Sequence, residues 1–195
     1  MKDEIKRIFN ESAELKRKSA LELSSQIEDI AKMLIKSVKN GGKIVLFGNG
    51  GSAADAQHMQ AELTHQFEVS NRKAIPCIAL TTNTSVLTAI GNDWGFDRVF
   101  ERQVEKFIDK KDIVIGFTTS GNSINVIKGI KQAKKEGAKT IAFSGRDGGK
   151  IKDISDICLI VPANNTARIQ EVHITVVHIL CGLIEKELSK DSKNK

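Results

Sequence analysis

The chain has 195 residues, which fits one domain and buries a substantial core without a disulfide framework. Its net charge of +6 would suit nucleic acid, but the lysines are dispersed, tyrosine is absent and there is one tryptophan. Basic residues therefore do not alternate with aromatic residues as they do on nucleic-acid-binding surfaces, and we expect an anionic small molecule as the partner instead.

The first forty residues predict a helical arm. Apolar residues in 4–38 recur at close to helical spacing, and the run ends at Gly41 and Gly42, a pair that stops helices. We expect one long helix or a pair of helices over 1–40, free to pack on a partner chain. The charges that interrupt this segment exclude a secretory signal, and no apolar run in the chain approaches the length that crosses a membrane.

Residues 43–188 predict an α/β core. Segments long enough for helices separate five short apolar runs, which is typical of a parallel five-stranded sheet flanked by helices on both faces, a flavodoxin-like three-layer sandwich. The segment 166–188 has helical period and a wide apolar face that suits the sheet or another subunit. Without an internal linker, 1–195 is expected to be a single domain. The predicted strands are KIVLFG (43–48), IPCIAL (75–80), DIVIGFT (112–118), KTIAFSG (139–145) and DICLIVP (156–162).

Three cysteines stand far apart among apolar neighbours: Cys77, Cys158 and Cys181. None is paired in a C-x-x-C motif, so we expect buried, reduced thiols. Reduced thiols and the lack of a secretory signal indicate a cytoplasmic protein.

A glycine-rich loop follows the first predicted strand. The sequence GNGGS (48–52) opens a helix, so its amides and the Ser52 hydroxyl lie where a helix N-terminus favours anions. It lacks the lysine of a Walker A loop, and Ala53 replaces the third glycine of a dinucleotide fingerprint. We therefore expect no nucleotide cofactor. On this loop alone, a tight turn without a ligand remains an alternative.

A second loop of similar chemistry, TTSGNS (118–123), also lies between a strand and a helix. Several hydroxyl groups join the amides of a helix start here, which matches the acceptor oxygens of a phosphomonoester. No lysine stands beside them to neutralise a transferring phosphoryl group, so the loop favours binding over phosphoryl transfer. A bound sugar phosphate is the natural interpretation. The hydroxyls belong to Thr118, Thr119, Ser120 and Ser123.

Polar side chains interrupt two of the predicted helices. His58 and Glu62 are four residues apart and share a helix face, so they are able to ligate one metal ion or act on one substrate. By spacing alone, a packed histidine beside a surface glutamate is the commoner arrangement. In the last helix, Gln170, His173 and His178 interrupt an apolar stretch, and their burial requires partners or a site. For either histidine alone, a hydrogen-bonded core residue remains an alternative.

Together these motifs resemble the sugar isomerase (SIS) fold and, within it, the phosphoheptose isomerases. The resemblance covers about 43–188. It implies conversion of sedoheptulose 7-phosphate to D-glycero-D-manno-heptose 7-phosphate, the first step of ADP-heptose synthesis for the lipopolysaccharide core, by a homotetramer. The motifs that carry it are GNGGSAADAQH (48–58), GNDWGFD (91–97), TSGNS (119–123) and ARIQEVHI (167–174).

The resemblance also implies a metal site, commonly zinc with one ion per subunit. Its ligands match His58, Glu62, Gln170 and His178, whereas His65 and His173 match none and are interpreted as structural. Gln170 and His178 differ by about 12 Å of rise and about 80° of rotation on one helix, which strains their reach to a single ion. Either the helix distorts or the ligands come from different subunits, and we hypothesise active sites between subunits.

A ketose–aldose isomerase needs a base, an acid and a group that stabilises an enediolate. We assign Glu62 as the base and His178 as the acid, with a metal or polar contacts as the electrophile. Because the same residues match metal ligands, we expect the two roles to share them. Some relatives carry an acidic residue where this chain has Ala167. The expected substrate contacts are Asn49, Gly50, Gly51, Ser52, Glu62, Gln170, the loop residues Asn92 and Asp93, and, for the phosphate, Thr118, Thr119, Ser120 and Ser123.

Three alternatives remain at this stage. Non-catalytic SIS proteins that bind a replication initiator tend to lose residues that match Gly51, Glu62 and His178, and this chain keeps all three. Sugar-sensing regulators usually carry a helix-turn-helix, for which the N-terminal arm is too short. Isomerisation of a six-carbon sugar phosphate stays open, because pocket length is not visible in a sequence.

Overall fold

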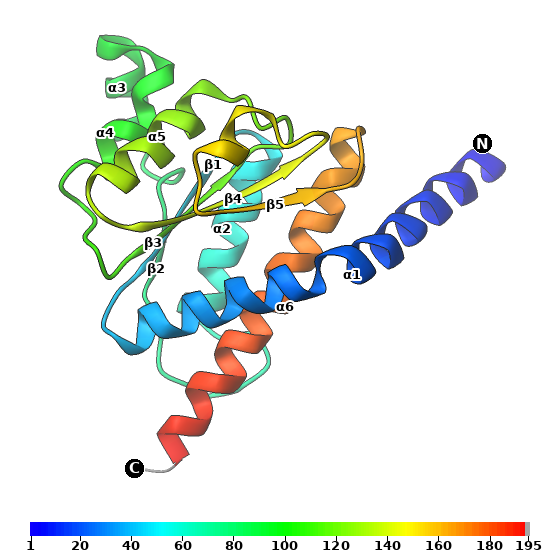
Figure 1. The fold of residues 1–195 in the computed structure, drawn as a ribbon, viewed down its shortest axis with the longest axis horizontal. Helices are drawn as coiled ribbons and strands as arrows, with labels where there is room; N and C mark the ends of the chain where they lie inside the picture. Colours follow the sequence, from blue (N-terminus) through cyan, green and yellow to red (C-terminus); the bar gives the residue numbers. More distant parts are fainter. Residues whose placement is uncertain (194–195) are drawn as a thin grey trace.

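The computed structural model describes residues 1–193, which form a three-layer α/β fold (Figure 1). Five strands make one all-parallel sheet in the order β2-β1-β3-β4-β5. Each predicted apolar run contains one strand, so the predicted fold class is confirmed. The strands are β1 (Ile44–Gly48), β2 (Cys77–Ala79), β3 (Ile113–Phe117), β4 (Lys139–Gly145) and β5 (Ile157–Val161).

Helices cover both faces of the sheet because alternate strand residues point to opposite sides. In β1, Ile44 and Leu46 pack into the core under α1, α2 and α6, while Val45 and Phe47 pack into the core under α4 and α5. Short 3-10 turns η1 (Phe96–Arg98) and η2 (Gly149–Asp153) complete the chain. The helices are α1 (Lys2–Lys39), α2 (Gly51–Thr64), α3 (Thr84–Trp94), α4 (Val99–Val104), α5 (Ile124–Lys135) and α6 (Thr166–Lys193).

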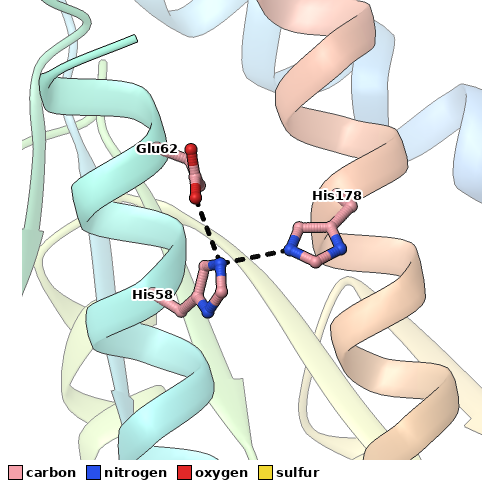
Figure 2. Close-up of side chains that lie close together, drawn as sticks. All are labelled: His58, Glu62 and His178. Carbon is pink, nitrogen blue, oxygen red and sulfur yellow. Dashed lines mark hydrogen bonds and ion pairs between the residues drawn. The ribbon is translucent and has the colours of Figure 1, made fainter. Parts of the chain in front are cut away.

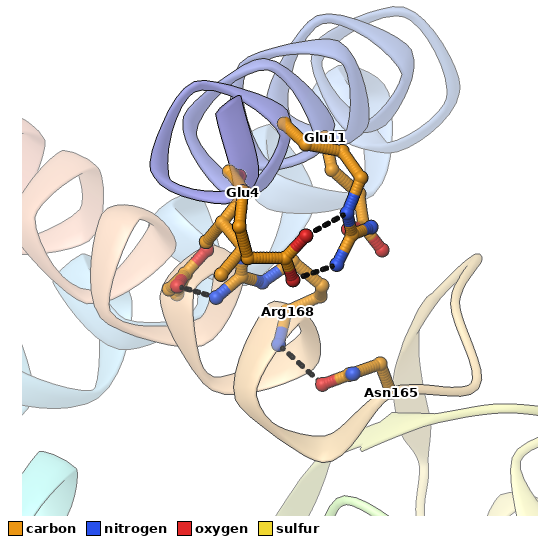
Figure 3. A network of polar contacts seen from close by, with 7 residues as sticks. Glu4, Glu11, Asn165 and Arg168 are labelled. Atoms are coloured by element: carbon orange, nitrogen blue, oxygen red, sulfur yellow. Dashed lines mark hydrogen bonds and ion pairs between the residues drawn. The ribbon is translucent and has the colours of Figure 1, made fainter. Parts of the chain in front are cut away.

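The N-terminal arm is one continuous helix, α1, whose buried residues all lie from Ser19 onward. In the first half, Phe9 keeps 73% of its surface exposed. Arg168 at the start of α6 contacts this half, because its Nη1 donates a hydrogen bond to the backbone oxygen of Ile8 at 3.0 Å (Figure 3). The exposed apolar residues fit the expectation of a segment free to pack on a partner.

Helix α6 corrects one expectation from the sequence. Over Thr166–Lys190 it is long and apolar enough to cross a membrane by length and composition alone, so the statement that no run approaches that length is wrong. In the fold, however, Val172, Val176 and Leu180 are buried in the core against the sheet. Helix α6 is therefore a core helix of this domain. Core helices are often as long and as apolar as helices that cross a membrane.

The three cysteines are free thiols, as predicted. Cys181 is buried, whereas Cys77 and Cys158 are partly exposed, so full burial is confirmed for Cys181 alone. Burial raises the pKa of the Cys158 thiol to about 11 and that of Cys181 to about 12, and it raises the pKa of Cys77 as well. All three are therefore protonated near neutral pH and poor nucleophiles.

Candidate functional site

Three predicted residues meet where α2 lies against α6 (Figure 2). His58 and Glu62 project from α2 toward His178 on α6. The Nε2 atom of His58 lies 3.1 Å from Nε2 of His178 and 3.1 Å from Oε1 of Glu62. One potential ligand atom from each residue lies within 4.8 Å of the others. Residues 120 positions apart in sequence thus form one polar cluster, which we call the His58–Glu62–His178 cluster.

The cluster is open on one side and walled on another. The side chain of His58 is 44% exposed and that of Glu62 is 25% exposed. The ring of Phe67 stacks on the imidazole of His178, with centroids 5.6 Å apart and planes 17° apart. A ligand is able to approach from the solvent side, while the Phe67 ring restricts how the His178 imidazole turns.

The donor set of this cluster fits a zinc ion, because two imidazole nitrogens and a carboxylate oxygen are common zinc ligands and leave a position open. A single chain supplies all three. Among the four predicted ligands, a second subunit would therefore be needed only to supply Gln170. The helix of α6 is continuous through both Gln170 and His178, so the alternative of a distorted helix is not seen.

Gln170 lies at the start of the α2–α6 seam, beside the glycine loop. A Cβ atom added to Gly51 would come within 2.4 Å of the Gln170 Nε2 atom, so glycine at this position makes room for the amide. Gln170 and His58 both line a hollow of about 370 Å³ between α2 and α6. Its lining residues are Ala54, Asp55, His58, Ala167, Gln170, Glu171 and Ile174.

Asp55 is a site-lining residue that the sequence analysis missed. The residue is 9% exposed, and its Oδ2 has no hydrogen-bond partner among the described residues. Burial raises the pKa of this carboxyl to about 6, against an opposing effect of the charge on His58. The available signal was an acidic residue three positions before His58, on the same face of a helix.

An asparagine pair joins the glycine loop to the start of α5, directly after the second predicted loop. Asn49 and Asn125 exchange amide hydrogen bonds of 2.8 and 2.9 Å, and Asn125 is buried at the start of α5. Gly50 adopts a positive φ of 56° as α2 begins, and Ser52 is buried behind it. Asn125 was missed in the sequence because nothing local marks a contact across 76 positions.

Some hydroxyl groups of the second loop form hydrogen bonds within the loop itself. Thr118 is buried, and its Oγ1 donates to Oγ of Ser123 at 3.0 Å. The Ser120 hydroxyl accepts a hydrogen bond from the backbone amide of Asn122 at 3.2 Å, while Thr119 and Ser120 are partly exposed. Gly121, at a φ of 68°, passes close to the backbone of Gly148. The loop is thus tightly held, with Thr119 and Ser120 accessible.

Asn92 and Asp93 lie in the last turn of α3, so the prediction that they lie in a loop is wrong. Asn83 caps the start of this helix by accepting from the Val86 amide, and the helix continues through the turn-forming residues to Trp94, with Gly95 as its C-cap. Asn92 donates to Asp93 at 2.8 Å, and both are exposed. Helix α3 packs on α4 and η1, on the side of the sheet opposite α2 and α6 (Figure 1), so one chain does not bring them to the cluster.

The two histidines interpreted as structural have different surroundings. His173 is fully buried, and its Nε2 lies 3.0 Å from the backbone oxygen of Ser144. Burial lowers the pKa of His173 to about 4, with the contact to Ser144 opposing the shift, so the ring is neutral at neutral pH. His65 is exposed just past the end of α2.

Comparison with known proteins decides the family. Residues 8–145 match the SIS domain family. The phosphoheptose isomerase of Aquifex aeolicus is 52% identical over 192 residues, covering 98% of this chain and 100% of that protein. The chain belongs to the phosphoheptose isomerase family.

Solved structures agree with this assignment. The phosphoheptose isomerase of Neisseria gonorrhoeae matches with a TM-score of 0.89 and 42% identity, covering 95% of this chain and 98% of that one. The enzyme of Francisella tularensis matches with a TM-score of 0.91 and 37% identity, covering 94% and 97%. The resemblance drawn from the sequence motifs, including the SIS fold, is therefore confirmed.

Proposed function

We propose that this protein is an isomerase that interconverts sedoheptulose 7-phosphate and D-glycero-D-manno-heptose 7-phosphate as a single SIS domain. Membership of the phosphoheptose isomerase family supports the substrate. The observation that carries the chemistry is the His58–Glu62–His178 cluster, which unites a carboxylate and two imidazoles at an open seam. The three free cysteines fit a reducing compartment, which supports a site of action in the cytoplasm.

The reaction moves one proton between neighbouring carbons and one between their oxygens. In our assignment the Glu62 carboxylate takes a proton from C1 of the ketose, while His178 donates a proton to the carbonyl oxygen on C2, and an enediol forms. His178 then takes the proton from the oxygen on C1, and Glu62 returns its proton to C2, which gives the aldose. Both groups are restored, as an isomerase requires.

We propose that His58, Glu62, Gln170 and His178 hold one zinc ion per chain. The two imidazoles and the carboxylate already converge on one point, and the Gln170 amide faces the same hollow as His58. Bound there, zinc would polarise the substrate carbonyl and favour the enediolate. Because Glu62 and His178 serve in both sets, ligation and proton transfer share these residues.

The two loops divide the substrate between them in this proposal. Thr118, Thr119, Ser120 and Ser123 bind the phosphate together with the amides at the start of α5. Asn49, Gly50, Gly51 and Ser52, with Glu62 and Gln170, contact the sugar. The Asn49–Asn125 pair holds these loops at a constant separation, which suits a substrate of fixed length.

Asn92 and Asp93 have a different place in the proposal. Since α3 holds them on the far face of the sheet, we propose that they contact sugar bound to a neighbouring subunit of a homotetramer. The exposed apolar first half of α1 supports such packing between chains. Sedimentation combined with assay tests this arrangement, and a fully active monomer would contradict it.

The activity is tested by incubating purified protein with sedoheptulose 7-phosphate and following the aldose product by NMR. We expect turnover, and no turnover with or without added zinc would contradict the proposal. Fructose 6-phosphate in a parallel sample tests the six-carbon alternative. A protein inert toward both sugars would instead favour the non-catalytic SIS proteins that bind a replication initiator.

A further inference from the structure

A buried ion pair lies behind the His58–Glu62–His178 cluster. The side chains of Arg72 and Glu185 are 4% and 1% exposed, and Arg72 Nε donates to Glu185 Oε1 at 2.5 Å. The same carboxylate accepts the backbone amides of Phe67, Glu68 and Val69 at 2.6 to 2.8 Å. Burial alone would raise the pKa of Glu185, but these donors outweigh it and lower the pKa. Glu185 is therefore a fully partnered carboxylate.

Arg72 connects this carboxylate to the turn of α2 that carries Glu62. Its Nη2 donates to the backbone oxygen of Glu62 at 2.6 Å, and its Nη1 donates to that of Leu63 at 2.7 Å. Carbonyls in the last turn of a helix lack partners within the helix, and a cation there also meets the negative end of the helix dipole. The planar guanidinium thus fixes the last turn of α2, which carries Glu62 of the cluster.

Glu185 connects the same unit to His178. The two residues are seven positions apart on α6, two helical turns, and so lie on the same face. By binding the Phe67 amide, Glu185 holds the segment after α2 where the Phe67 ring stacks on the His178 imidazole. Both the backbone of Glu62 and the ring of His178 therefore depend on one buried ion pair.

We propose that Arg72 and Glu185 are positioning residues that set the orientation of Glu62 and His178 for the isomerase reaction. The proposal rests on the proposed function for its catalytic consequence. Its structural part does not rest on that function, because it states only that the ion pair determines whether the Phe67 ring stacks on His178. A carboxylate and a forked cation suit this task because together they satisfy three amides and three carbonyls, those of Glu62, Leu63 and Lys73.

The test compares Glu185→Gln with a matched control, Asp112→Asn. Asp112 is also a buried carboxylate, 3% exposed, which accepts two backbone amides and an ion pair from Lys43. None of its partners belongs to the cluster. NMR of protein with labelled histidine rings reports the shift that the Phe67 ring imposes on His178, and Phe67→Leu provides the value for a ring that is absent.

We expect Glu185→Gln to move the His178 ring signals toward those of Phe67→Leu and to lower kcat by about 10- to 100-fold, in the range seen for residues that orient ligands. KM should stay within about twofold, because the phosphate loop is untouched. Asp112→Asn should lower thermal stability while leaving the His178 signals and kcat as in the wild type.

Wild-type His178 signals and wild-type kcat in Glu185→Gln would overturn the proposal, as would equal changes in Asp112→Asn. Should Glu185→Gln fail to fold, Arg72→Lys, which keeps the charge but loses the fork, decides by the same two measurements. A wild-type protein without isomerase activity would overturn the proposed function alone, since the NMR comparison still tests whether the ion pair orients the ring.

Discussion

Two histidines five residues apart on α6 have opposite environments. His173 points into the sheet, where it is fully buried and contacts one backbone oxygen, that of Ser144. His178 points toward α2, where it is half-buried and meets His58 and the Phe67 ring. Five residues rotate a helix by about 140°, so the two rings lie on different faces. The difference shows that the face, rather than the residue type, separates a structural histidine from a candidate catalytic one.

The same contrast applies to their chemistry. In the buried environment the low dielectric disfavours the charged imidazole, which lowers the pKa of His173 to about 4 and leaves it neutral. At the seam, the His178 ring faces a neighbouring imidazole and lies close to a carboxylate, with room for a ligand. A neutral, enclosed ring holds the core together, whereas an accessible ring is able to exchange protons.

The largest effect is expected on the open side of α6. His178→Ala and Glu62→Gln should each lower kcat by about 10² to 10⁴-fold, the usual contribution of a positioned acid or base. Thermal unfolding should change little, because neither side chain belongs to the core. Steady-state kinetics with calorimetry measures both, and a variant with wild-type kcat would remove that residue from the mechanism.

For the buried histidine, His173, the expected effect is on stability. His173→Ala leaves a cavity and an unpartnered Ser144 oxygen, so the free energy of unfolding should fall by about 2 to 4 kcal/mol. Urea denaturation measures the loss. The kcat of the folded variant should stay within a few-fold of the wild type, and a loss as large as that of His178→Ala would break the comparison.

The buried histidine should also make stability depend on pH. Between pH 6.5 and about 4 the unfolded chain binds a proton at His173 that the folded chain excludes, so stability falls as pH falls. Over this window the loss is about 3 kcal/mol. Asp55, with its pKa raised to about 6, changes stability in the opposite direction over these pH values. The free energy of unfolding is therefore measured against pH for the wild type and for His173→Gln, and the difference between the two curves removes the contribution of Asp55. A difference that is flat with pH would contradict the assigned burial effect.

Zinc should stabilise the protein by binding at the His58–Glu62–His178 cluster, and His173 should not be needed. A free zinc concentration 100 times the dissociation constant would add about 2.7 kcal/mol to folding stability if only the folded chain binds it. The midpoint of thermal unfolding should rise with zinc in the wild type and in His173→Ala, but not in His178→Ala. Chelator should reverse the increase. Equal stabilisation of all three proteins would place the ion elsewhere.

The smallest effect is expected at Gly51. Alanine there would press its Cβ against the Gln170 amide, which is the flexible end of a side chain and is able to move. We expect kcat/KM to fall a few-fold and stability to stay within about 1 kcal/mol. The control is Gly182→Ala, whose added Cβ meets Phe67 at an ordinary 3.6 Å. An unchanged Gly51→Ala would argue against a role for the Gln170 position.

Much of the fold was predictable from the sequence, because strands of a parallel sheet are buried on both faces and therefore consist of continuous apolar runs. Within the candidate site, the i and i+4 spacing of His58 and Glu62 predicted their shared face, which the 3.1 Å contact confirms. Asn92 and Asp93 were placed wrongly, because residues that favour turns also occur where helices end, and α3 continues through both to its C-cap Gly95. Asn125, Arg72 and Glu185 carried no local signal, whereas Asp55 had one, its place three residues before His58 on the same helix.

By itself the sequence determined the five strands, the helical arm, the two loops at helix starts and the pairing of His58 with Glu62. These follow from periods of two and 3.6 residues and from local backbone preferences. The family resemblance implied that His178 joins that pair and that His173 is structural, but only the tertiary structure shows the contacts of each, and it alone decided that Glu185 binds the segment carrying Phe67. The contacts of His178 with His58 and of Glu185 with Phe67 join residues more than 100 positions apart, so tertiary packing rather than local preference determines them.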